Sequence, residues 1–450
     1  MIRQSLYRRL IIPLSPPGTF AKPFASSSSS PSSPSTRPTT DGPLAGVRVL
    51  DLGQVVAGNF AGALLGYFGA NVIKVESPQG DQLRDLRVLD PAGVSLWWRA
   101  HGRNKRSIAV NLHTDPGRDL IRRLAHQSDV ILENFRPGVM EKWGLGPSDL
   151  PASLIYGRIS GYGQTGPYAK KPGYASVCEG VGGFRYLNGY PDRAPVRPNI
   201  SLGDTLAALH CVLGITMSLY HQQRLSAPSS PSSPTTNAKA PGQVVDAAIT
   251  ESVYNMLEAV MAEEAAAGVD RHPSGSTISG VVPSGTFRTK DDQWVIIGGN
   301  GDSVYSRLME TVGRPDMTAA HDDYRSNARR MEKEAEIMDA ISGWCGGKTL
   351  GEVCDAMETA RVPAGPILRA SDIASHPQFK ARQMMHERVP VPGHDHTVDL
   401  PALLPLLSET PGRTRHAGAD LGHHTDEVLR EELGLTEKEL TGLRAAGVIA

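Results

Sequence analysis

Short apolar runs alternate with segments of helical apolar spacing from residue 44 onward. Residues 47–52 have the apolar character of a buried strand, residues 59–68 follow as a helix with small residues at its start, and residues 71–76 repeat the strand pattern. A strand, a glycine-containing turn, a helix and a second strand in that order predict a βαβ unit of a parallel sheet.

The same unit recurs further along the chain. Buried-strand patterns also occur at 107–110, 129–133, 154–159 and 243–247. Helices lie between them, one opening with an N-cap and first-turn pair at Asp115-Pro116 and a long one following Asp204. This repetition predicts a doubly wound α/β architecture with its strand-end loops at one edge of the sheet, where open α/β sheets bind ligands. The predicted loops are 53–58, 133–138 and 160–167.

A smaller α+β region is predicted after a helix at 251–265 and a Gly/Ser/Pro-rich loop at 273–284. Its predicted strand is 294–297, its helices are 303–312, 328–344 and 350–358, and a turn lies at 362–366. The C-terminal part, from His376 onward, is predicted to end in short helices.

These patterns predict five parts. Residues 1–43 are a leader and residues 44–225 the first part of a large domain. Residues 226–241 are a Ser/Pro-rich insertion, 242–370 a linker and small domain, and 371–450 a return to the large domain.

Composition narrows the function classes. The 450 residues are 40% hydrophobic and 21% charged, and Lys+Arg of 46 nearly equals Asp+Glu of 47. This balance gives no basic footprint for nucleic acid. We expect no membrane partner, since no apolar run reads as long enough to span a bilayer. The 4 cysteines contain no C-x-x-C pair, which indicates neither a disulfide framework nor a zinc site.

The first 40 residues differ in character from the rest. They contain no Asp or Glu, carry several Arg and Lys residues, and include a Ser/Pro tract at 26–40. This composition is typical of an organellar transit peptide and predicts mitochondrial localisation. A cytoplasmic protein whose leader carries no address is the alternative.

Asp204 is the most informative single residue. It follows a Pro-rich run and Gly203, directly before a long apolar helix. Asp is a preferred N-cap residue, so one interpretation is a helix cap alone. The other is a carboxylate nucleophile kept ionised by the helix dipole.

Familiar catalytic motifs are missing from the sequence. There is no G-x-S-x-G, H-E-x-x-H or Walker loop, and the glycines near residue 60 do not fit G-x-G-x-x-G. His423 and His424 lie beside Asp426, but adjacent side chains diverge, so we expect no bound metal.

A series of sequence blocks runs in one order through the chain after the leader. The blocks are 44–52, 69–76, 104–108, 133–138, 161–167, Gly203-Asp204, 242–246, Asn300, 362–367 and 421–426. Together they resemble the class III CoA-transferases, the relatives of formyl-CoA transferase, carnitine CoA-transferase and alpha-methylacyl-CoA racemase. The ordered set covers nearly everything after the leader.

This resemblance implies a fold and an assembly. It implies a Rossmann-like large domain whose parallel sheet is formed from both chain ends, and a smaller α+β middle domain. Two ring-shaped subunits are expected to interlock as a homodimer.

The resemblance also implies a CoA site on the strand-end loops. The residues implied to bind CoA are Gln54, Val55, Ala57, Arg106, Val110, Asn134, Phe135, Lys142 and Tyr174. Arg106 and Arg84 are possible phosphate partners, with solvated surface charge as the alternative. No permanently bound cofactor is expected, because coenzyme A and acyl-CoA are substrates.

Asp204 aligns with the catalytic aspartate of the family. It would attack the acyl-CoA thioester, pass through a mixed anhydride and an aspartyl-CoA thioester, and give CoA to an acceptor carboxylate. Residues 275–284 are a possible lid, or a plain surface loop. Arg197 or Arg158 would pair with a second carboxylate of the acceptor, or would be a structural ion-pair partner.

The sequence departs from the family at one loop. Where many relatives have Gly-Tyr-Asp followed by Gln, this chain has Gly173-Tyr174-Ala175 and Glu179, which either binds backbone amides or acts in catalysis. The racemase branch carries His-Asp at Tyr174-Ala175, which favours transfer over racemisation. The resulting prediction is a CoA-transferase that moves CoA from succinyl-CoA, a similar donor or acetyl-CoA to a small carboxylic acid. An acyl-CoA racemase or isomerase and a non-catalytic acyl-CoA-binding protein are the alternatives.

Overall fold

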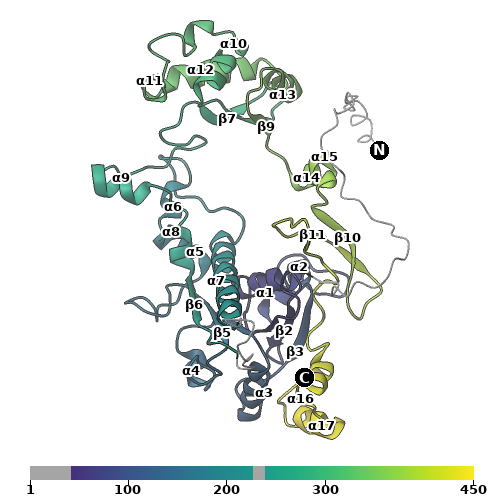
Figure 1. The fold of residues 1–450 in the computed structure, drawn as a ribbon. Helices are drawn as coiled ribbons and strands as arrows, with labels where there is room; N and C mark the ends of the chain where they lie inside the picture. Colours follow the sequence, from purple (N-terminus) through teal and green to yellow (C-terminus); the bar gives the residue numbers. More distant parts are fainter. Residues whose placement is uncertain (1–41, 227–238) are drawn as a thin grey trace, which may run out of the picture. The chain divides into compact units, whose positions relative to one another are not determined.

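A six-stranded sheet organises the large part of the chain (Figure 1). The computed structural model describes residues 42–226 and 239–450, so the predicted leader up to residue 41 and most of the predicted insertion lie outside it. The strands are β1 (Arg48–Asp51), β2 (Asn71–Glu76), β3 (Lys105–Ala109), β4 (Val130–Glu133), β5 (Ile155–Ser160) and β6 (Val244–Ala248).

All neighbouring strands of this sheet are parallel, in the order β3-β2-β1-β4-β5-β6. Every predicted strand of the sheet is present, with ends shifted by a residue or two. The strand order reverses direction between β1 and β4, and ligands bind at such a switch point in open α/β sheets.

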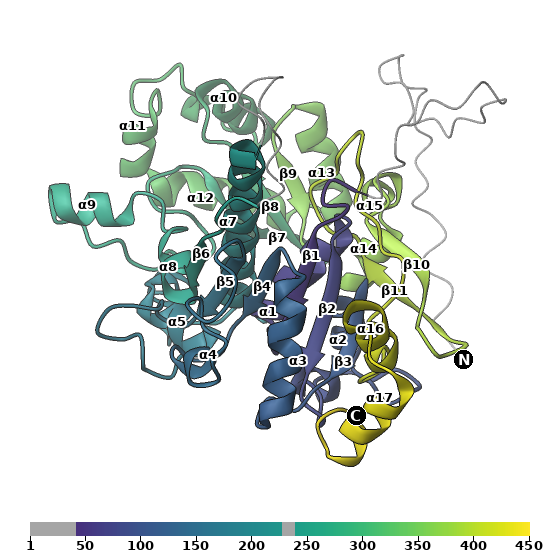
Figure 2. The same cartoon turned by 60° about the horizontal axis from the view of Figure 1, so that its bottom comes forward.

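Alternate strand residues face two separate cores, as the two-residue period of a strand requires. On one face, strand residues such as Leu50 and Ile131 pack with α3 (Asp115–His126), α16 (Thr425–Leu433) and α17 (Glu437–Ala445). On the other, residues such as Val49 and Val130 pack with α1 (Ala57–Tyr67) and α7 (Leu202–Ser226). Figure 2 shows α3, α16 and α17 on the same side of the sheet. The predicted doubly wound architecture is confirmed.

The prediction that both chain ends form the sheet is wrong. All six strands lie between residues 48 and 248. The C-terminal end adds α16 and α17, whose Val428, Leu429 and Leu440 are buried at helical spacing, and one antiparallel bridge between Val110 and Ile449. Both ends therefore build the core, but only the N-terminal half builds the sheet.

Helix α7 begins earlier than its sequence indicated. It starts at Leu202, so Asp204 lies in its first turn and does not precede the helix as its cap. The amide of Thr205 bonds to the carbonyl of Ser201 at 3.1 Å, which closes this first turn. The first prediction for Asp204, a helix cap, is thereby overturned.

Helix α7 is also long and apolar enough to cross a membrane, judged by length and composition alone. The expectation that no segment reaches this threshold is wrong. One stripe of the helix, including Ala207, Cys211 and Ile215, is buried against β5, β6 and α1. These contacts make α7 a core helix of the α/β layers, and its length and composition alone do not place it in a membrane.

A second region has a core of its own. Its sheet is antiparallel, in the order β7 (Ser284–Arg288), β8 (Trp294–Gly298) and β9 (Ala364–Pro366). It packs with α10 (Asp302–Thr311), α12 (Glu334–Gly346) and α13 (Leu350–Thr359). The predicted turn at 362–366 is in part a strand, because the backbone of residues 364–366 pairs with β8 and forms β9.

Two features of this half of the chain differ from the predictions. The segment from His376 onward ends in short helices, α16 and α17, as predicted, but it also holds an unpredicted hairpin, β10 (Met385–Pro390) and β11 (Thr397–Pro401). Its strands bury only Val389, Val398 and Leu400, so their apolar pattern is weak. The helix predicted at 251–265 is two helices, separated by a segment in which Glu258 has a φ of +53°.

The remaining elements are short. They are η1 (Gln82–Asp85), α2 (Leu96–His101), α4 (Val139–Lys142), α5 (Ala175–Val181), α6 (Phe184–Leu187), α8 (Ile249–Tyr254), α9 (Val260–Ala267), η2 (Pro315–Met317), α11 (Asn327–Glu332), α14 (Ala370–Ser375) and α15 (Pro377–Ala381).

Candidate active site

The loops after β1 and β4 are joined to each other at the switch point of the sheet. The backbone N–H of Gln54 donates to Oδ1 of Asn134 at 2.6 Å, and Nδ2 of Asn134 donates to the carbonyl of Gln54 at 2.9 Å. Because β1 and β4 are parallel neighbours, their carboxyl ends meet, and the Asn134 amide links the two loops.

Val55 has a conformation that β-branched residues rarely adopt. Its φ is +56°, and its N–H donates to both carboxylate oxygens of Asp81 at 3.1 Å. Asp81 also accepts from Nδ2 of Asn59 at 2.7 Å and from the N–H of Leu83 at 2.9 Å. Backbone strain of this kind persists only where the surroundings hold it, and Asp81 supplies that hold.

A buried ionic network, the loop cluster, lies beneath this turn. It comprises Asp51, Lys74, Asp81 and Lys105. Nζ of Lys105 lies 2.8 Å from Oδ2 of Asp51, whose Oδ1 accepts from the N–H of Gly53 at 2.8 Å. Nζ of Lys74 donates to the carbonyl of Gly53 and lies 3.7 Å from Asp81. Every charge of the loop cluster therefore has an opposite charge beside it.

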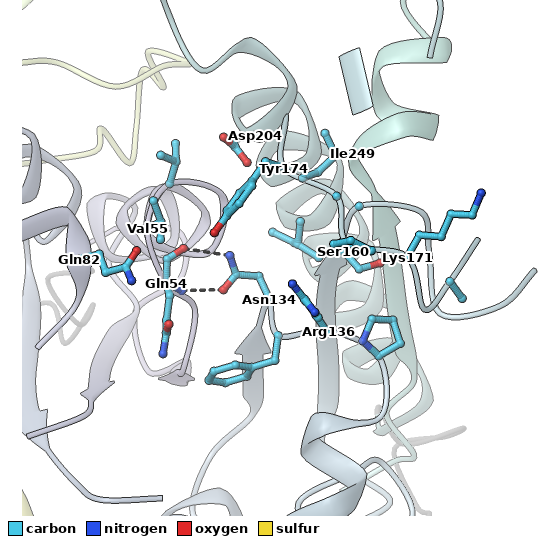
Figure 3. Close-up of a pocket in the computed structure, with 18 residues that line it drawn as sticks. Gln54, Val55, Gln82, Asn134, Arg136, Ser160, Lys171, Tyr174, Asp204 and Ile249 are labelled. Atoms are coloured by element: carbon cyan, nitrogen blue, oxygen red, sulfur yellow. Dashed lines mark hydrogen bonds between the residues drawn. The ribbon is translucent and has the colours of Figure 1, made fainter. Parts of the chain in front are cut away.

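A cavity of about 330 Å³ opens at these loops. Figure 3 shows Asp204 beside the ring of Tyr174, with Gln54 and Asn134 below them. Of the residues predicted from sequence, those that line it are Gln54, Val55, Asn134, Phe135, Tyr174 and Asp204. The structure thus gathers six predicted site residues from four separate stretches of the chain.

Asp204 is the carboxylate of this cavity. Within the described residues its side chain makes no hydrogen bond and no ion pair. Burial, and then the like charge of Glu179, raise the pKa of Asp204 to about 6, while the charge of Arg197 lowers it. The N-terminal end of α7 favours the ionised form. A carboxylate with this pKa is mostly ionised at neutral pH. Because it makes no hydrogen bond or ion pair among the described residues, it is free to act as a nucleophile.

Glu179 lies behind Asp204 and is fully buried. Its Oε1 accepts from the N–H of Gly203 at 3.1 Å, and its Oε2 lies 3.2 Å from Nη1 of Arg185 and 3.8 Å from Nε of Arg197. The predicted bond from Glu179 to a backbone amide is present. Glu179, Arg185, Arg197 and Asp204 are called the α7 cluster below.

The other predicted CoA-binding residues lie away from this cavity. Ala57 and Val110 are buried in the two cores of the sheet, and Lys142 is exposed at the end of α4. The guanidinium of Arg106 pairs with Glu427, Glu431 and Glu432.

Two further arginines from the sequence are held in ion pairs. Arg84 pairs with Glu76 at 2.7 Å and stacks on Trp98, and Arg158 pairs with Glu133 and Glu141, each at 2.7 Å. Arg158 is therefore the structural ion-pair partner that we gave as its alternative. Arg84 is buried in an ion pair, so it is not the solvated surface charge that we gave as its alternative.

The predicted lid segment, residues 275–284, contributes to a different cavity. Thr277, Ile278 and Ser279 line a space with Phe184 and Leu187. Its position gives no direct support to a lid over Asp204.

Sequence reasoning missed several residues that line the cavity. They are Gln82, Arg136, Ser160, Lys171 and Ile249, among others. Arg136 and Lys171 are exposed cations, and Nζ of Lys171 lies 3.3 Å from the ring centre of Tyr168. Their position in the sequence could have indicated them, because Arg136 follows Asn134-Phe135 and Lys171 follows the third strand-end loop.

Among residues 42–226 and 239–450, no group of three or more His, Cys, Asp or Glu is placed to hold a metal ion. Nδ1 of His424 accepts from the N–H of Ser107 at 3.2 Å, and Asp426 pairs with Arg444 at 2.6 Å. These residues of the sequence Leu421–Asp426 therefore have structural contacts.

Comparison with known proteins identifies the family. The sequence profile of CoA-transferase family III matches residues 44–425. The chain belongs to CoA-transferase family III. The predicted family is confirmed, and the chain is an enzyme that transfers CoA.

The chain is similar to named CoA-transferases over nearly the whole length of both proteins. The succinyl-CoA–D-citramalate CoA-transferase of Chloroflexus aurantiacus is 40% identical over 414 residues, which cover 90% of this chain and 98% of that protein. The beta subunit of the succinyl-CoA–L-malate CoA-transferase of the same organism is 36% identical over 419 residues, covering 91% and 99%. A crystal structure of a CAIB/BAIF family protein from Brucella suis matches with a TM-score of 0.74 and 28% identity, covering 87% and 99%.

Proposed function

We propose that this CoA-transferase moves CoA from succinyl-CoA, or a similar acyl-CoA, to a small carboxylic acid, with Asp204 as the nucleophile. The observation that carries the proposal is the Asp204 carboxylate, which lies in the cavity at the switch point without a structural partner among the described residues. The donor follows from the names of the relatives, two of which use succinyl-CoA.

The proposed reaction has four balanced steps. Asp204 attacks the acyl carbon of the thioester, the C–S bond breaks, CoA leaves as thiolate, and the acyl group and Asp204 form a mixed anhydride. The thiolate attacks the aspartyl carbonyl, and the donor acid leaves with its oxygen. The acceptor carboxylate then attacks the aspartyl-CoA thioester and releases the thiolate, which takes the acceptor acyl group and restores Asp204. Each step exchanges one acyl bond for another, as in covalent catalysis generally.

We place CoA along the strand-end loops. Gln54, Val55, Asn134, Phe135 and Tyr174 line the cavity there. The exposed cations Arg136 and Lys171 suit a ligand that carries phosphates. Backbone N–H groups of these loops would stabilise the oxyanion of each tetrahedral step.

The test is capture of the intermediate. Incubation with succinyl-CoA, followed by hydroxylamine or borohydride and mass spectrometry, is expected to modify Asp204 alone. The Asp204→Asn variant should fold and bind CoA but lose exchange by about 10³-fold or more. If no adduct forms and solvent deuterium enters the α carbon of the acyl group, the enzyme is a racemase or isomerase. A panel of oxalate, glutarate, malate, citramalate, itaconate and acetate identifies the acceptor, and acetyl-CoA is the second donor to assay.

We also propose a homodimer, as expected from the resemblance. Supporting this, α7 carries exposed apolar side chains at helical spacing on the side away from its buried stripe. They are Leu209, Leu213, Met217 and Tyr220. Monomers rarely expose such contiguous apolar surface. Light scattering is expected to give a dimer, and Leu213→Glu with Met217→Glu should weaken it, whereas a monomeric wild type would contradict the proposal.

We propose mitochondrial localisation on the composition of residues 1–40. A full-length fusion to a fluorescent protein is expected in mitochondria, and a cytosolic signal would overturn the proposal.

A further inference from the structure

The α7 cluster contains two carboxylates and two guanidinium groups, but their contacts are unequal. Oε2 of Glu179 lies within hydrogen-bond distance of Arg185, at 3.2 Å, and farther from Arg197, at 3.8 Å. Asp204 faces the cavity and has no such contact among the described residues. The carboxylate of Glu179 is thus occupied by contacts within the cluster, whereas the carboxylate of Asp204 is free to react with a ligand.

Arg197 has unused hydrogen-bonding capacity. Its side chain is 45% exposed, and the ion pair with Glu179 is its one side-chain contact within the described parts of the chain. A guanidinium carries five N–H donors in a planar fork that matches a carboxylate. Arg158, the other arginine considered from the sequence, is only 6% exposed and pairs with two glutamates. Of the two arginines considered from the sequence, Arg197 is therefore the one with donors free for a ligand. It is not among the residues that line the cavity, but its charge acts on Asp204 and lowers the pKa of that carboxyl.

The charge of the α7 cluster changes during the proposed reaction. With Asp204 ionised, the positive and negative charges are equal in number. When Asp204 becomes an anhydride or a thioester, its charge is lost and the cluster has one positive charge in excess. A ligand that keeps a negative charge beside the reacting carbon would restore the balance, and a dicarboxylic acid does so through its second carboxylate.

We propose that Arg197 determines substrate specificity by binding the second carboxylate of a dicarboxylic acid, and that Glu179 is the positioning residue that keeps Arg197 beside Asp204. This inference rests on the proposed function, because it requires acyl groups to be transferred at Asp204. Glu179 fixes the geometry from behind, since its other oxygen bonds to the amide of Gly203, the residue before the nucleophile.

The test compares butanoate and succinate as CoA acceptors, two acids of four carbon atoms with one and two carboxylates. Acetyl-CoA is the donor, because transfer from succinyl-CoA to succinate would produce no net change. Wild type is expected to prefer succinate in kcat/KM by at least about tenfold, the effect of one charge-assisted contact. Arg197→Gln should reduce this preference by about tenfold to a hundredfold, mainly through the KM of succinate. Arg197→Lys keeps the charge and should retain part of the preference.

Arg193→Gln is the matched control. Arg193 lies four residues away in the same segment, is 70% exposed, and its recorded ion pair is with Asp192. Its loss should leave the preference unchanged. The inference is overturned if Arg197→Gln keeps the wild-type preference, or if wild type treats the two acids alike. A wild type that forms no adduct on Asp204 and exchanges no CoA would instead refute the proposed function.

Glu179→Gln adds a readout that a merely structural role would not move. Glutamine keeps an oxygen for the amide of Gly203 but removes the negative charge beside Asp204. The acid limb of the pH profile should therefore shift to lower pH in Glu179→Gln and to higher pH in Arg197→Gln, since one like charge and one opposite charge are lost. Cys178 is the other titratable group that senses Asp204. Two unshifted or parallel profiles would contradict the assigned positions of these charges.

Discussion

The loop cluster and the α7 cluster each contain two acids and two bases, yet they serve the site in different ways. In the loop cluster the four side chains are almost wholly excluded from solvent. Asp51, Lys74 and Asp81 bond to backbone groups of the turn at 53–55, and Lys105 bonds to Asp51 and to the carbonyl of Asn59. In the α7 cluster one carboxylate faces the cavity without a partner among the described residues, and one arginine is nearly half exposed.

This difference indicates that the loop cluster holds the turn in place, whereas the α7 cluster is the one available for a reaction. A buried ion pair with all its hydrogen bonds made is costly to break but has nothing left to offer a substrate. Burial and the like charge of Glu179 destabilise the ionised Asp204 and raise its pKa, which supports its proposed role in catalysis. The two clusters contain the same numbers of acidic and basic side chains, so these numbers do not identify the candidate active site. The unpaired carboxylate at the cavity does.

Lys105→Met should have the largest effect on stability. It removes the partner of buried Asp51 and also the contact from Nζ of Lys105 to the carbonyl of Asn59 at 2.8 Å. Breaking a buried pair leaves an uncompensated charge, so the free energy of unfolding should fall by about 3–5 kcal/mol in denaturant titrations.

The exposed pair Arg325–Asp322 gives the control. Arg325→Met should cost less than about 1 kcal/mol. If Lys105→Met does not fold, Asp51→Asn in the same chain should restore part of the stability by removing the orphaned charge. Equal losses for the two single variants would show that the loop cluster is not a support.

Asn134→Ala should loosen the turn at the switch point. Both hydrogen bonds to Gln54 are lost, and each is worth about 1 kcal/mol net. We expect the KM of acyl-CoA to rise about tenfold, with a smaller change in kcat. Asn71→Ala, at the opposite and exposed end of β2, should change neither constant, and a larger kcat effect for Asn134→Ala would contradict a role in binding.

The pH dependence tests the state of Asp204. Because its pKa is raised from 3.8 to about 6, the carboxylate becomes protonated as pH falls through 6 and loses its nucleophilicity. The rate of adduct formation should be constant above about pH 7 and approach a tenfold fall per pH unit below the pKa. A rate that stays flat down to pH 4.5, with the fold intact by circular dichroism, would place the pKa at its ordinary value.

Val55→Gly should have the smallest effect. Glycine adopts a φ of +56° without strain, but its unfolded chain is more flexible and it loses a side chain, so these terms offset to within about 1 kcal/mol. Val72→Gly in β2, where the side chain is buried and φ is ordinary, should cost about 3 kcal/mol or more. Similar losses at both sites would argue against strain at Val55.

Most strands of the sheet were predictable because they are short, largely apolar runs between polar turns. Strand β3 begins with the polar residues Lys105, Arg106 and Ser107, and its start was predicted two residues too late. The hairpin after His376 was not, since its strands bury few side chains and therefore show no clear apolar alternation. Helix starts were also missed, because α7 begins at Leu202 with its amide at Gly203 bonded to Glu179, a residue far away in sequence.

The site was predictable to a similar extent. Residues directly after strands, such as Gln54 and Asn134, line the cavity, because position along the chain fixes where a strand ends. Arg106, predicted to bind CoA, does not line the cavity, and its ion-pair partners lie in α16, more than three hundred residues later. A local sequence pattern cannot predict an ion-pair partner that is distant in the sequence and comes close only in the folded chain.

Capture of the covalent intermediate tests the central claim most directly. Wild type is incubated with succinyl-CoA and trapped with hydroxylamine, and the peptide that contains Asp204 is sequenced by mass spectrometry. We predict a modification at Asp204 that is absent from Asp204→Asn. An enzyme that exchanges CoA at full rate with Asp204 unmodified would contradict the account.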